Sequence, residues 1–490
     1  MPLPNLLFIF TDEQRADTLA AYGNGQIEMP NLNRLAKSST VFENAYCTSP
    51  VCTPSRSAIL TGLFSHANGA IENNTPLRAD IPCLPEYLPK GKYVAGYYGK
   101  WHLGDEIFAQ HGFDEWVSIE DEYMRWYSPS RDRSARSSYH AFLAQSGILP
   151  DKPDGLYSRD LSARLPESLG KPAFLGTRAS EFIRRNQSHP WILYVNFLEP
   201  HMPFFGPRDQ QYDLESIPLP KNFYSYPDER NHPKARLIAQ GYYERGHSGL
   251  PLKTEEDWRR LIANYWGLNS LVDTHAGKIL QTVEECGLQD QTVIVFTSDH
   301  GDMMGSHHLL AKCVMYEEAV RIPLLIHLPG QSGSARFAGP VSQIDLLPTL
   351  LDLLGFGYPS SLHGQSLKPL LVGNTHEQDR DVFIEWNGTE TGILEVYERA
   401  GLSPTLASMT TIEDFRSAIA DPLRTIITPN QKKLVLSQAG HHELYDLVSD
   451  RFETNNLIHD PGWQANHKKM VEKIANWQEM TGDIIPLFQS

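Results

Sequence analysis

Short apolar runs alternate with amphipathic stretches along most of the chain. Five runs, rich in branched and aromatic side chains and too short for independent helices, predict buried strands: residues 6–10, 93–98, 192–197, 292–296 and 323–328. Residues 271–285 repeat apolar positions at helical spacing before Gly287, and residues 344–354 do the same before Gly355. Strands that alternate with helices are typical of an α/β fold built on a mainly parallel sheet.

Two long segments, residues 118–170 and 205–260, break this pattern. They are polar and rich in Arg and Tyr, with scattered Pro and Gly, so we expect insertions over the sheet, where specificity elements usually lie. From about residue 375 the pattern changes again, and short strands are predicted at residues 381–386, 424–428 and 433–436, followed by a helix around residues 470–477. We therefore predict a large α/β domain over residues 1–375 and a smaller C-terminal α+β subdomain, with an antiparallel sheet and a closing helix, over residues 376–490.

The composition supports a folded protein with a large core. Of the 490 residues, 41% are hydrophobic and 10% aromatic, which excludes wholesale disorder. The 43 Lys and Arg against 59 Asp and Glu give a net charge of −16, and general nucleic-acid binding needs clustered positive charge instead, so we expect no nucleic-acid partner. An anionic small substrate stays open, because a basic pocket can lie inside an acidic protein.

The number and spacing of the cysteines and the hydropathy of the chain bear on its cellular compartment. The five cysteines lack Cys-x-x-Cys spacing, which argues against a disulfide scaffold and against a thiolate metal site. No stretch approaches the roughly 18 apolar residues that span a membrane, and residues 6–10 are too short for the core of a signal peptide. We expect a soluble, cytoplasmic chain with no membrane partner, or an exported one if residues once preceded Met1. The oligomeric state is not indicated.

Polar residues of catalytic type directly follow four of the predicted strands. These are Asp12 and Glu13, Lys100 and His102, Glu199 and His201, and Asp299 and His300. In an open parallel sheet, ligands bind beyond the carboxyl ends of the strands, so these groups are predicted to converge on one crevice. One such acid alone would more simply cap a helix or form a turn, but four groups together favour a site.

The acids among these residues suggest a metal centre. Asp12, Glu13 and Asp299 with the imidazole of His300 suit a hard divalent cation such as calcium, magnesium or manganese better than a structural zinc. The alternative is that Glu13 is solvated and His300 caps a helix. Spacing alone does not decide between these two interpretations.

A second pattern covers residues 52–62, Cys-Thr-Pro-Ser-Arg-Ser-Ala-Ile-Leu-Thr-Gly. Pro54 fits the first turn of a helix and Gly62 its end. Cys52 would then lie at a helix N-terminus, where backbone N–H groups favour anionic oxygens, and Arg56 adds a fixed charge. The alternative is a small buried cysteine.

Residues 52–56, with Leu-Thr-Gly at 60–62, resemble the signature of the formylglycine-dependent (type I) sulfatases of the alkaline phosphatase superfamily. Other segments are similar to the family's further motifs: Gly-Lys-Trp-His at 99–102, His-Met-Pro-Phe at 201–204, Ser-Asp-His-Gly-Asp at 298–302 with Lys312 downstream, and Glu-Leu-Tyr-Asp-Leu at 443–447. The similar segments follow the expected order from Asp12 to Leu447. The resemblance implies an alkaline phosphatase-like fold, in which a large mixed, mainly parallel sheet is flanked by helices.

The resemblance also implies a nucleophile and a metal. In this family a maturation enzyme oxidises the cysteine of the signature to formylglycine, whose hydrate is the nucleophile. The position of Cys52 matches that cysteine. The implied metal ligands are Asp12, Glu13, Asp299, His300 and the modified Cys52, and the implied ion is Ca²⁺, with Mn²⁺ or Mg²⁺ as alternatives. Glu13 departs from the Asp or Gln that the family usually has there.

Further roles follow from the same resemblance. Lys100 and Lys312 match residues that hold the sulfate oxygens, and Arg56 matches the residue that stabilises the hydrated aldehyde. His201 would protonate the leaving alcohol, and His102 would remove a proton from the second hydroxyl. Asn73 matches an asparagine near the substrate of related phosphonate monoester hydrolases, although a turn-forming role is the alternative.

The implied activity is hydrolysis of a small-molecule or saccharide sulfate ester by a catalytic domain over residues 1–375. One alternative is the phosphonate monoester hydrolase or phosphodiesterase branch, whose members typically have Tyr and Thr where Lys100 and His102 stand, and Gln in place of Glu13. Another is a binding protein that leaves Cys52 unmodified. The sequence does not choose among carbohydrate, aryl, alkyl and choline sulfates.

Overall fold

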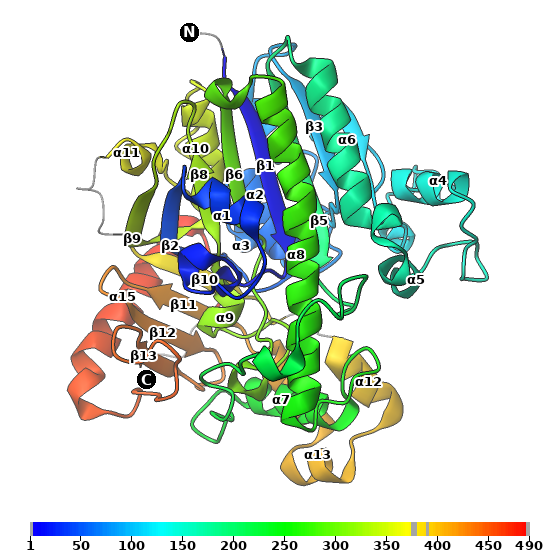
Figure 1. The fold of residues 1–490 in the computed structure, drawn as a ribbon. Coiled ribbons are helices and arrows are strands. Elements are labelled where there is room, and N and C mark those ends of the chain that lie inside the picture. Colours follow the sequence, from blue (N-terminus) through cyan, green and yellow to red (C-terminus); the bar gives the residue numbers. More distant parts are fainter. Residues whose placement is uncertain (1–2, 374–379, 389–391, 487–490) are drawn as a thin grey trace.

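The computed structural model describes residues 3–373, 380–388 and 392–486, and a mixed sheet of nine strands lies at its centre (Figure 1). Hydrogen-bonded neighbours follow the order β4 (Glu115–Val117), β3 (Val94–Gly99), β5 (Trp191–Pro200), β1 (Asn5–Asp12), β6 (Thr292–Ser298), β8 (Leu324–His327), β2 (Thr40–Tyr46) and β7 (Arg321–Ile322), while β9 (Ala335–Ser342) also pairs with β2. The strands from β4 to β6 are parallel, and β8 is antiparallel to both β6 and β2. The predicted α/β class is confirmed, and all five predicted strands are present.

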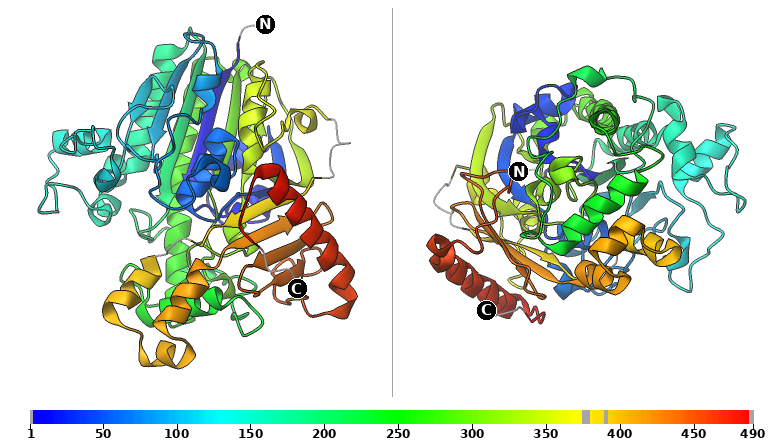
Figure 2. Two further views of the ribbon diagram at one scale, coloured as in Figure 1. Left: turned by 180° about the vertical axis from the view of Figure 1, so that it is seen from behind. Right: turned by 90° about the horizontal axis from the view of Figure 1, so that it is seen from below.

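Helices cover both faces of this sheet. Phe8 of β1 belongs to a hydrophobic cluster that includes residues of α2 (Cys52–Thr61) and α10 (Leu346–Leu353). Ile9, the next residue, belongs to a second cluster with α6 (Lys171–Asn186) and α8 (Glu255–Glu285). Successive side chains of a strand point to opposite faces, so a strand that is buried on both sides needs the continuous apolar run seen in β1. The left view of Figure 2 shows, from behind, the face of the sheet that α2 and α10 cover.

Helix α8 begins earlier than predicted. The hydroxyl of Thr254 accepts a hydrogen bond from the N–H of Asp257, and the carboxylate of Asp257 accepts one from the N–H of Thr254. This capping box starts the helix at Glu255, so the prediction of an insertion that continues to residue 260 is wrong for its last six residues. The remaining helices are α1 (Pro30–Ala36), α3 (Ser65–Asn68), α4 (Ser138–Gln145), α5 (Arg159–Arg164), α7 (Pro233–Arg245), α9 (Glu317–Val320), α11 (Lys368–Leu371), α12 (Gly392–Ala400), α13 (Pro404–Met409), α14 (Ile412–Ala420) and α15 (Gln464–Thr481).

The C-terminal part forms a small antiparallel sheet, as predicted. Its order is β10 (Val382–Trp386), β11 (Leu423–Ile427), β12 (Lys432–Ser437) and β13 (Glu443–Asp446). Helix α15 closes one face, where Ile474 and Trp477 pack with Ile426 and Leu434. Ile384 of β10 belongs to the same hydrophobic cluster as Phe8, so this sheet is packed against the main body. The predicted boundary between residues 375 and 376 lies outside the described residues.

A buried ion pair connects the end of α15 to the small sheet. The guanidinium of Arg424 on β11 binds both carboxylate oxygens of Asp483, at 2.7 and 2.8 Å. A third nitrogen, Nη1, donates to the backbone carbonyl of Trp386 at 3.1 Å. Both side chains are almost fully buried, so removal of either partner would leave an uncompensated charge in the interior.

We expect Arg424→Met to lower the free energy of unfolding by about 3–5 kcal/mol, because Asp483 would lose its buried counter-charge. The measurement is equilibrium denaturation in urea. The control is Arg416→Met, which removes the pair with Glu398, where the Arg416 side chain is 54% exposed; such a pair contributes about 0–1 kcal/mol. Equal effects of the two substitutions would contradict the structural role of the buried pair.

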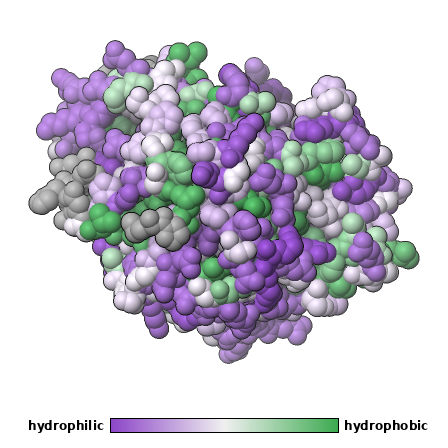
Figure 3. Space-filling model, turned by 90° about the horizontal axis from the view of Figure 1, so that it is seen from above, coloured by the Kyte–Doolittle hydropathy of each residue, from purple (hydrophilic) through white to green (hydrophobic). Residues whose placement is uncertain are grey.

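The surface is largely hydrophilic on the face seen from above, with scattered hydrophobic residues (Figure 3). Helix α8 has 31 residues, but charged and polar positions interrupt its apolar ones. Among the described residues, no helix combines the length and the apolar character needed to cross a membrane.

Candidate active site

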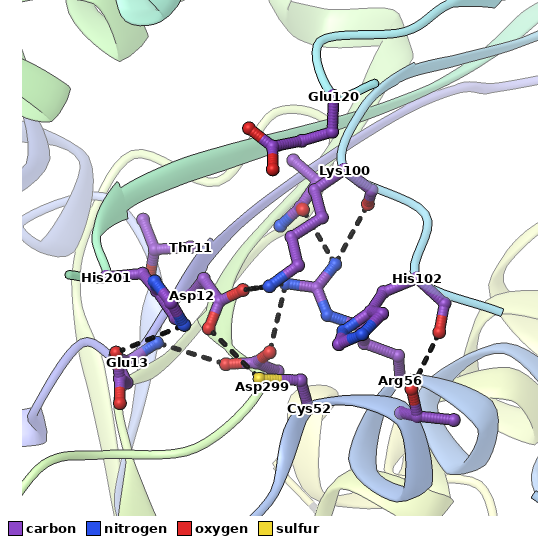
Figure 4. A network of polar contacts seen from close by, with 12 residues as sticks. Thr11, Asp12, Glu13, Cys52, Arg56, Lys100, His102, Glu120, His201 and Asp299 are labelled. Carbon is purple, nitrogen blue, oxygen red and sulfur yellow. Dashed lines mark hydrogen bonds and ion pairs between the residues drawn. The ribbon is translucent and has the colours of Figure 1, made fainter. Parts of the chain in front are cut away.

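The carboxyl ends of four parallel strands bring the predicted residues together (Figure 4). Asp12 ends β1, Asp299 follows β6, Lys100 follows β3 and His201 follows β5. The side chains of Asp12 and Asp299 are completely buried, and the Nζ of Lys100 lies 2.5 Å from Oδ2 of Asp12. The predicted convergence of these side chains at this edge of the sheet is therefore present.

Cys52 reaches the same point from the first residue of α2. Its Sγ lies 3.6 Å from Oδ1 of Asp12 and 3.3 Å from Nε2 of His300. The helix ends at Gly62, which has a left-handed backbone with φ +64°, the conformation that favours glycine at this position. Burial, and next the charge of Asp12, raise the pKa of the Cys52 thiol to about 12. The unmodified side chain is therefore a neutral thiol at pH 7.

Arg56, one turn further along α2, joins the two buried acids. Its Nη2 lies 2.8 Å from Asp12 and 3.0 Å from Asp299. Its Nη1 donates to Oδ1 of Asn196 at 2.7 Å and to the carbonyl of Lys100 at 2.9 Å. Burial alone would raise the pKa of Asp12, but the charges of Lys100 and Arg56 outweigh it and hold this pKa well below its usual range. Asp12 is consequently an anion at any ordinary pH.

Glu13 lies beside Asp12 with its carboxylate directed to other partners. It forms an ion pair with Lys312, and its Oε2 lies 3.6 Å from Nε2 of His201. Burial raises the pKa of Glu13 to about 7, although the charge of Lys312 opposes this. Three acids, Asp12, Glu13 and Asp299, thus lie among three bases: Arg56, Lys100 and Lys312.

Two histidines lie on the borders of this charged group. Nδ1 of His201 donates to the carbonyl of Met202 at 2.7 Å, and Nε2 of His102 lies 3.0 Å from Oδ1 of Asn74. Burial, and next Lys100 for His102 and Lys312 for His201, hold both pKa values well below the usual range. Both rings are therefore neutral near pH 7.

Three residues of the site have unusual backbone conformations. The φ angles are +69° at Glu13 and +59° at His102, in the left-handed region that side chains with a Cβ rarely adopt. At Gly99 φ is +122°, and a Cβ there would lie 1.9 Å from the carbonyl oxygen of Asn196. Only glycine fits between the end of β3 and β5, which places Lys100 at the site. Strained backbone of this kind is concentrated at functional sites.

The donor set fits a divalent cation. One ligand atom each from Asp12, Cys52, Asp299 and His300 lies within 4.8 Å of the others, and all four residues are buried. Two carboxylates and an imidazole suit such a cation, whereas the thiol of Cys52 is a soft donor that a hard cation does not prefer. Glu13 belongs to a second group of possible ligands, with Asp12 and His201. Its predicted role as a ligand stays a prediction.

Asn73 lies at the start of α2. Its Oδ1 accepts a hydrogen bond from the N–H of Thr53 at 3.1 Å, so it caps this helix. Its neighbour Asn74, which the sequence did not single out, contacts His102 instead. The predicted contact of Asn73 with substrate stays a prediction.

Sequence reasoning also missed two positioning residues. The carboxylate of Glu106 accepts hydrogen bonds from the N–H groups of Trp101 and His102, at 2.8 and 2.6 Å, and so fixes the loop that carries His102. Asn196 bridges Arg56 and the carbonyl of Phe10. The sequence did carry a signal for Asn196, because it is a polar residue inside the apolar run at 192–197.

Comparisons with known proteins identify the family of the chain. The family model described as Sulfatase matches residues 4–356. The chain is 28% identical to the uncharacterized sulfatase YidJ of Escherichia coli, across 100% of this chain and 90% of that protein. It is 26% identical to the N-acetylglucosamine-6-O-sulfatase of Bacteroides thetaiotaomicron, across 99% and 88%.

Among solved structures, the phosphonate monoester hydrolase SpPMH of Silicibacter pomeroyi has the same fold, with a TM-score of 0.76 and 24% identity. The match covers 98% of this chain and 96% of that one. Because the family model covers well over half of the sequence, the chain belongs to the sulfatase family and is a sulfuric ester hydrolase.

Proposed function

We propose that this chain hydrolyses sulfate monoesters to an alcohol and inorganic sulfate, using formylglycine made from Cys52 beside one divalent cation. The observation that carries the proposal is the position of Cys52, at the first residue of α2 and in contact with Asp12 and His300. We assign the reaction to a catalytic domain over residues 1–375, with residues 376–490 as the smaller subdomain. The substrate class is a small-molecule or saccharide sulfate ester, and the relative named as an N-acetylglucosamine-6-O-sulfatase supports a sulfated sugar.

The state of Cys52 favours its modification. A thiol with a pKa of about 12 is protonated at pH 7, and thiolate is the nucleophilic form of cysteine. Hydrated formylglycine, made by a separate maturation enzyme, supplies two hydroxyl groups on one carbon: one for attack on sulfur and one whose deprotonation releases sulfate. Residue 52 is the first residue of α2, at the helix end whose dipole favours anionic oxygens.

Asp12, Asp299 and His300, with an oxygen of modified residue 52, would hold the cation. We propose Ca²⁺, with Mn²⁺ or Mg²⁺ as alternatives. A bound divalent cation lowers the pKa of a coordinated hydroxyl group and so provides a strong nucleophile near neutral pH. Arg56 would hold the carboxylates of Asp12 and Asp299 in position for the cation, since one of its nitrogens contacts both.

Lys100 and Lys312 are the proposed ligands of the sulfate oxygens. Each is ion-paired with a carboxylate, Lys100 with Asp12 and Lys312 with Glu13. When Glu13 is ionised, three acids and three bases cancel, so a divalent cation together with a monoanionic sulfate ester would leave these groups with a net charge near +1. That excess stabilises the negative charge that develops on the oxygens as the ester bond breaks.

The two histidines are the proposed proton carriers. His102 is neutral, the form that a base needs, and Asn74 and Glu106 fix its ring and backbone. His201 would donate to the leaving alcohol. After burial, the charge of Lys312 is the main cause of its low pKa. A sulfate anion bound to Lys312 would offset that charge, so substrate binding itself raises the pKa of His201 toward the range of an acid.

Paired initial rates on matured enzyme test the proposal, with an aryl sulfate and an aryl phosphonate monoester. We expect kcat/KM to favour the sulfate, and a chelator to reduce both rates by about a hundredfold or more, because several kcal/mol of charge stabilisation would be lost. Added Ca²⁺ should restore the rates. Mass spectrometry of the peptide with residue 52 from the same preparation reports its modification.

The other outcomes select the alternatives. A preference for the phosphonate would assign the chain to the phosphonate monoester hydrolase branch, whose fold SpPMH shares, and would show that Lys100 and His102 do not distinguish the branches. An unmodified thiol in all of the protein from its native host would overturn the formylglycine mechanism.

A further inference from the structure

A second group of charges lies next to the candidate active site, on the insertion over residues 118–170. Glu120 and Lys171 are almost fully buried and form an ion pair, and Nε of Arg159, the first residue of α5, donates to Glu120 at 2.7 Å. Two bases thus share one carboxylate. Figure 4 shows Glu120 beyond Lys100, on the side away from Cys52.

Hydrogen bonds fix the orientation of Arg159 but do not use all of its N–H donors. Its Nη2 donates to the hydroxyl of Tyr123 at 2.8 Å, and the ring of Tyr123 lies 4.5 Å from that of His102. Among the described residues, its Nη1 has no hydrogen-bond partner, and the side chain is 20% exposed. Glu122 lies 3.6 Å from Arg159 but is paired with Lys152. Nη1 of a guanidinium with a fixed orientation therefore keeps its N–H donors for a ligand.

Arg159 also lines a cavity that reaches His201. The cavity encloses about 30 Å³ and opens to solvent, and Arg159, Lys171, Glu199 and His201 are among the residues that line it. The first residues of α6 also line the cavity, and Gly170 gives that helix no side-chain cap.

We infer that this cavity, which we call the Arg159 pocket, binds a second anionic group, a carboxylate or sulfate carried by the alcohol part of the substrate. The inference rests on the proposed function, because the leaving alcohol lies on the His201 side of the scissile bond. Nε and Nη2 of Arg159 are used by Glu120 and Tyr123, so Nη1 is the nitrogen that would donate charge-assisted hydrogen bonds to the oxygens of a carboxylate or sulfate. The preferred substrates are then sulfate esters of acidic sugars or sugars with two sulfate groups.

The test compares 4-nitrophenyl sulfate with its ring-carboxylated analogue on matured enzyme. We expect Arg159→Gln to lower the ratio of kcat/KM for the carboxylated to the plain ester by about tenfold or more, through KM, because a buried hydrogen-bonded charge contact is lost. Arg159→Lys keeps a charge beside Glu120 but loses the Nη1 donors, so we expect the same fall of the ratio without loss of stability. The control is Arg184→Gln on α6, whose side chain is 54% exposed and pairs with Glu285.

The outcomes separate this inference from the proposed function. Hydrolysis of both esters with a ratio that neither Arg159 variant changes would overturn the Arg159 pocket and leave the sulfatase proposal intact. If the wild type hydrolyses neither ester, the proposed function fails, and calorimetric binding of the two nitrophenol products still tests the pocket. Equal affinity of the wild type and Arg159→Gln for the carboxylated product would then overturn it.

Discussion

Replacement of Cys52 by serine is expected to reduce the steady-state kcat for an aryl sulfate by about a thousandfold or more. Serine keeps an oxygen at the start of α2, within reach of Asp12 and His300, but it supplies one hydroxyl group where hydrated formylglycine supplies two. The first half of the reaction would remain possible, whereas release of sulfate would have no second hydroxyl group to drive it. We therefore expect at most one turnover, measured as a burst of product and as the mass of one added sulfo group on the intact protein.

Cys286→Ser is the control for this substitution. Cys286 follows the last residue of α8 as its C-cap, at the amino-terminal side of β6 and away from the site, so activity should stay within about twofold of the wild type. Repeated turnover by Cys52→Ser would show that residue 52 does not act through formylglycine.

The convergence of the candidate catalytic residues was predictable because it depends on topology. Parallel strands end at one edge of a sheet, so Asp12, Lys100, His201 and Asp299 had to meet once their strands were recognised. These strands are buried on both faces, and their continuous apolar runs are easy to detect. Cys52 was likewise placed by local signals, with Pro54 in the first turn of α2 and Gly62 after its end.

Strand β2 was not predicted, and its sequence shows why. Glu43 and Asn44 interrupt the apolar run Thr40–Tyr46. In the structure Glu43 pairs with Arg336 at the surface, and the amide of Asn44 donates to the carbonyl of Ala338 where the pairing with β9 shifts register. A β-bulge of this kind turns polar residues toward partners that are almost 300 positions away, and periodicity cannot reveal such partners.

The same limit applies to the contacts within the site. The sequence identified Glu13 as an acid at a strand end but could not show that its carboxylate pairs with Lys312. Asn73 and Asn74 are adjacent and of one residue type, yet only the three-dimensional arrangement assigns one to the start of α2 and the other to His102. Long-range side-chain pairing, unlike strand order, leaves no periodic trace in a single sequence.

Asp12→Asn is expected to remove both the bound cation and the activity. The substitution preserves shape but deletes one of three buried negative charges, so Arg56, Lys100 and Lys312 would face only Glu13 and Asp299. An excess positive charge repels a divalent cation, and an amide is a weaker ligand than a carboxylate. We expect less than one equivalent of metal by elemental analysis and a loss of about a hundredfold to a thousandfold in kcat/KM.

The matched control is Asp290→Asn, which makes the same chemical change at an exposed position just before the amino end of β6. It should leave metal content and rate unchanged within about twofold. Thermal unfolding of both variants separates loss of the metal from loss of the fold, because Asp12→Asn also removes a buried counter-charge of Lys100 and Arg56. A full equivalent of metal in folded Asp12→Asn, with activity near that of the wild type, would exclude Asp12 from the metal centre and shift its role to positioning Arg56 and Lys100.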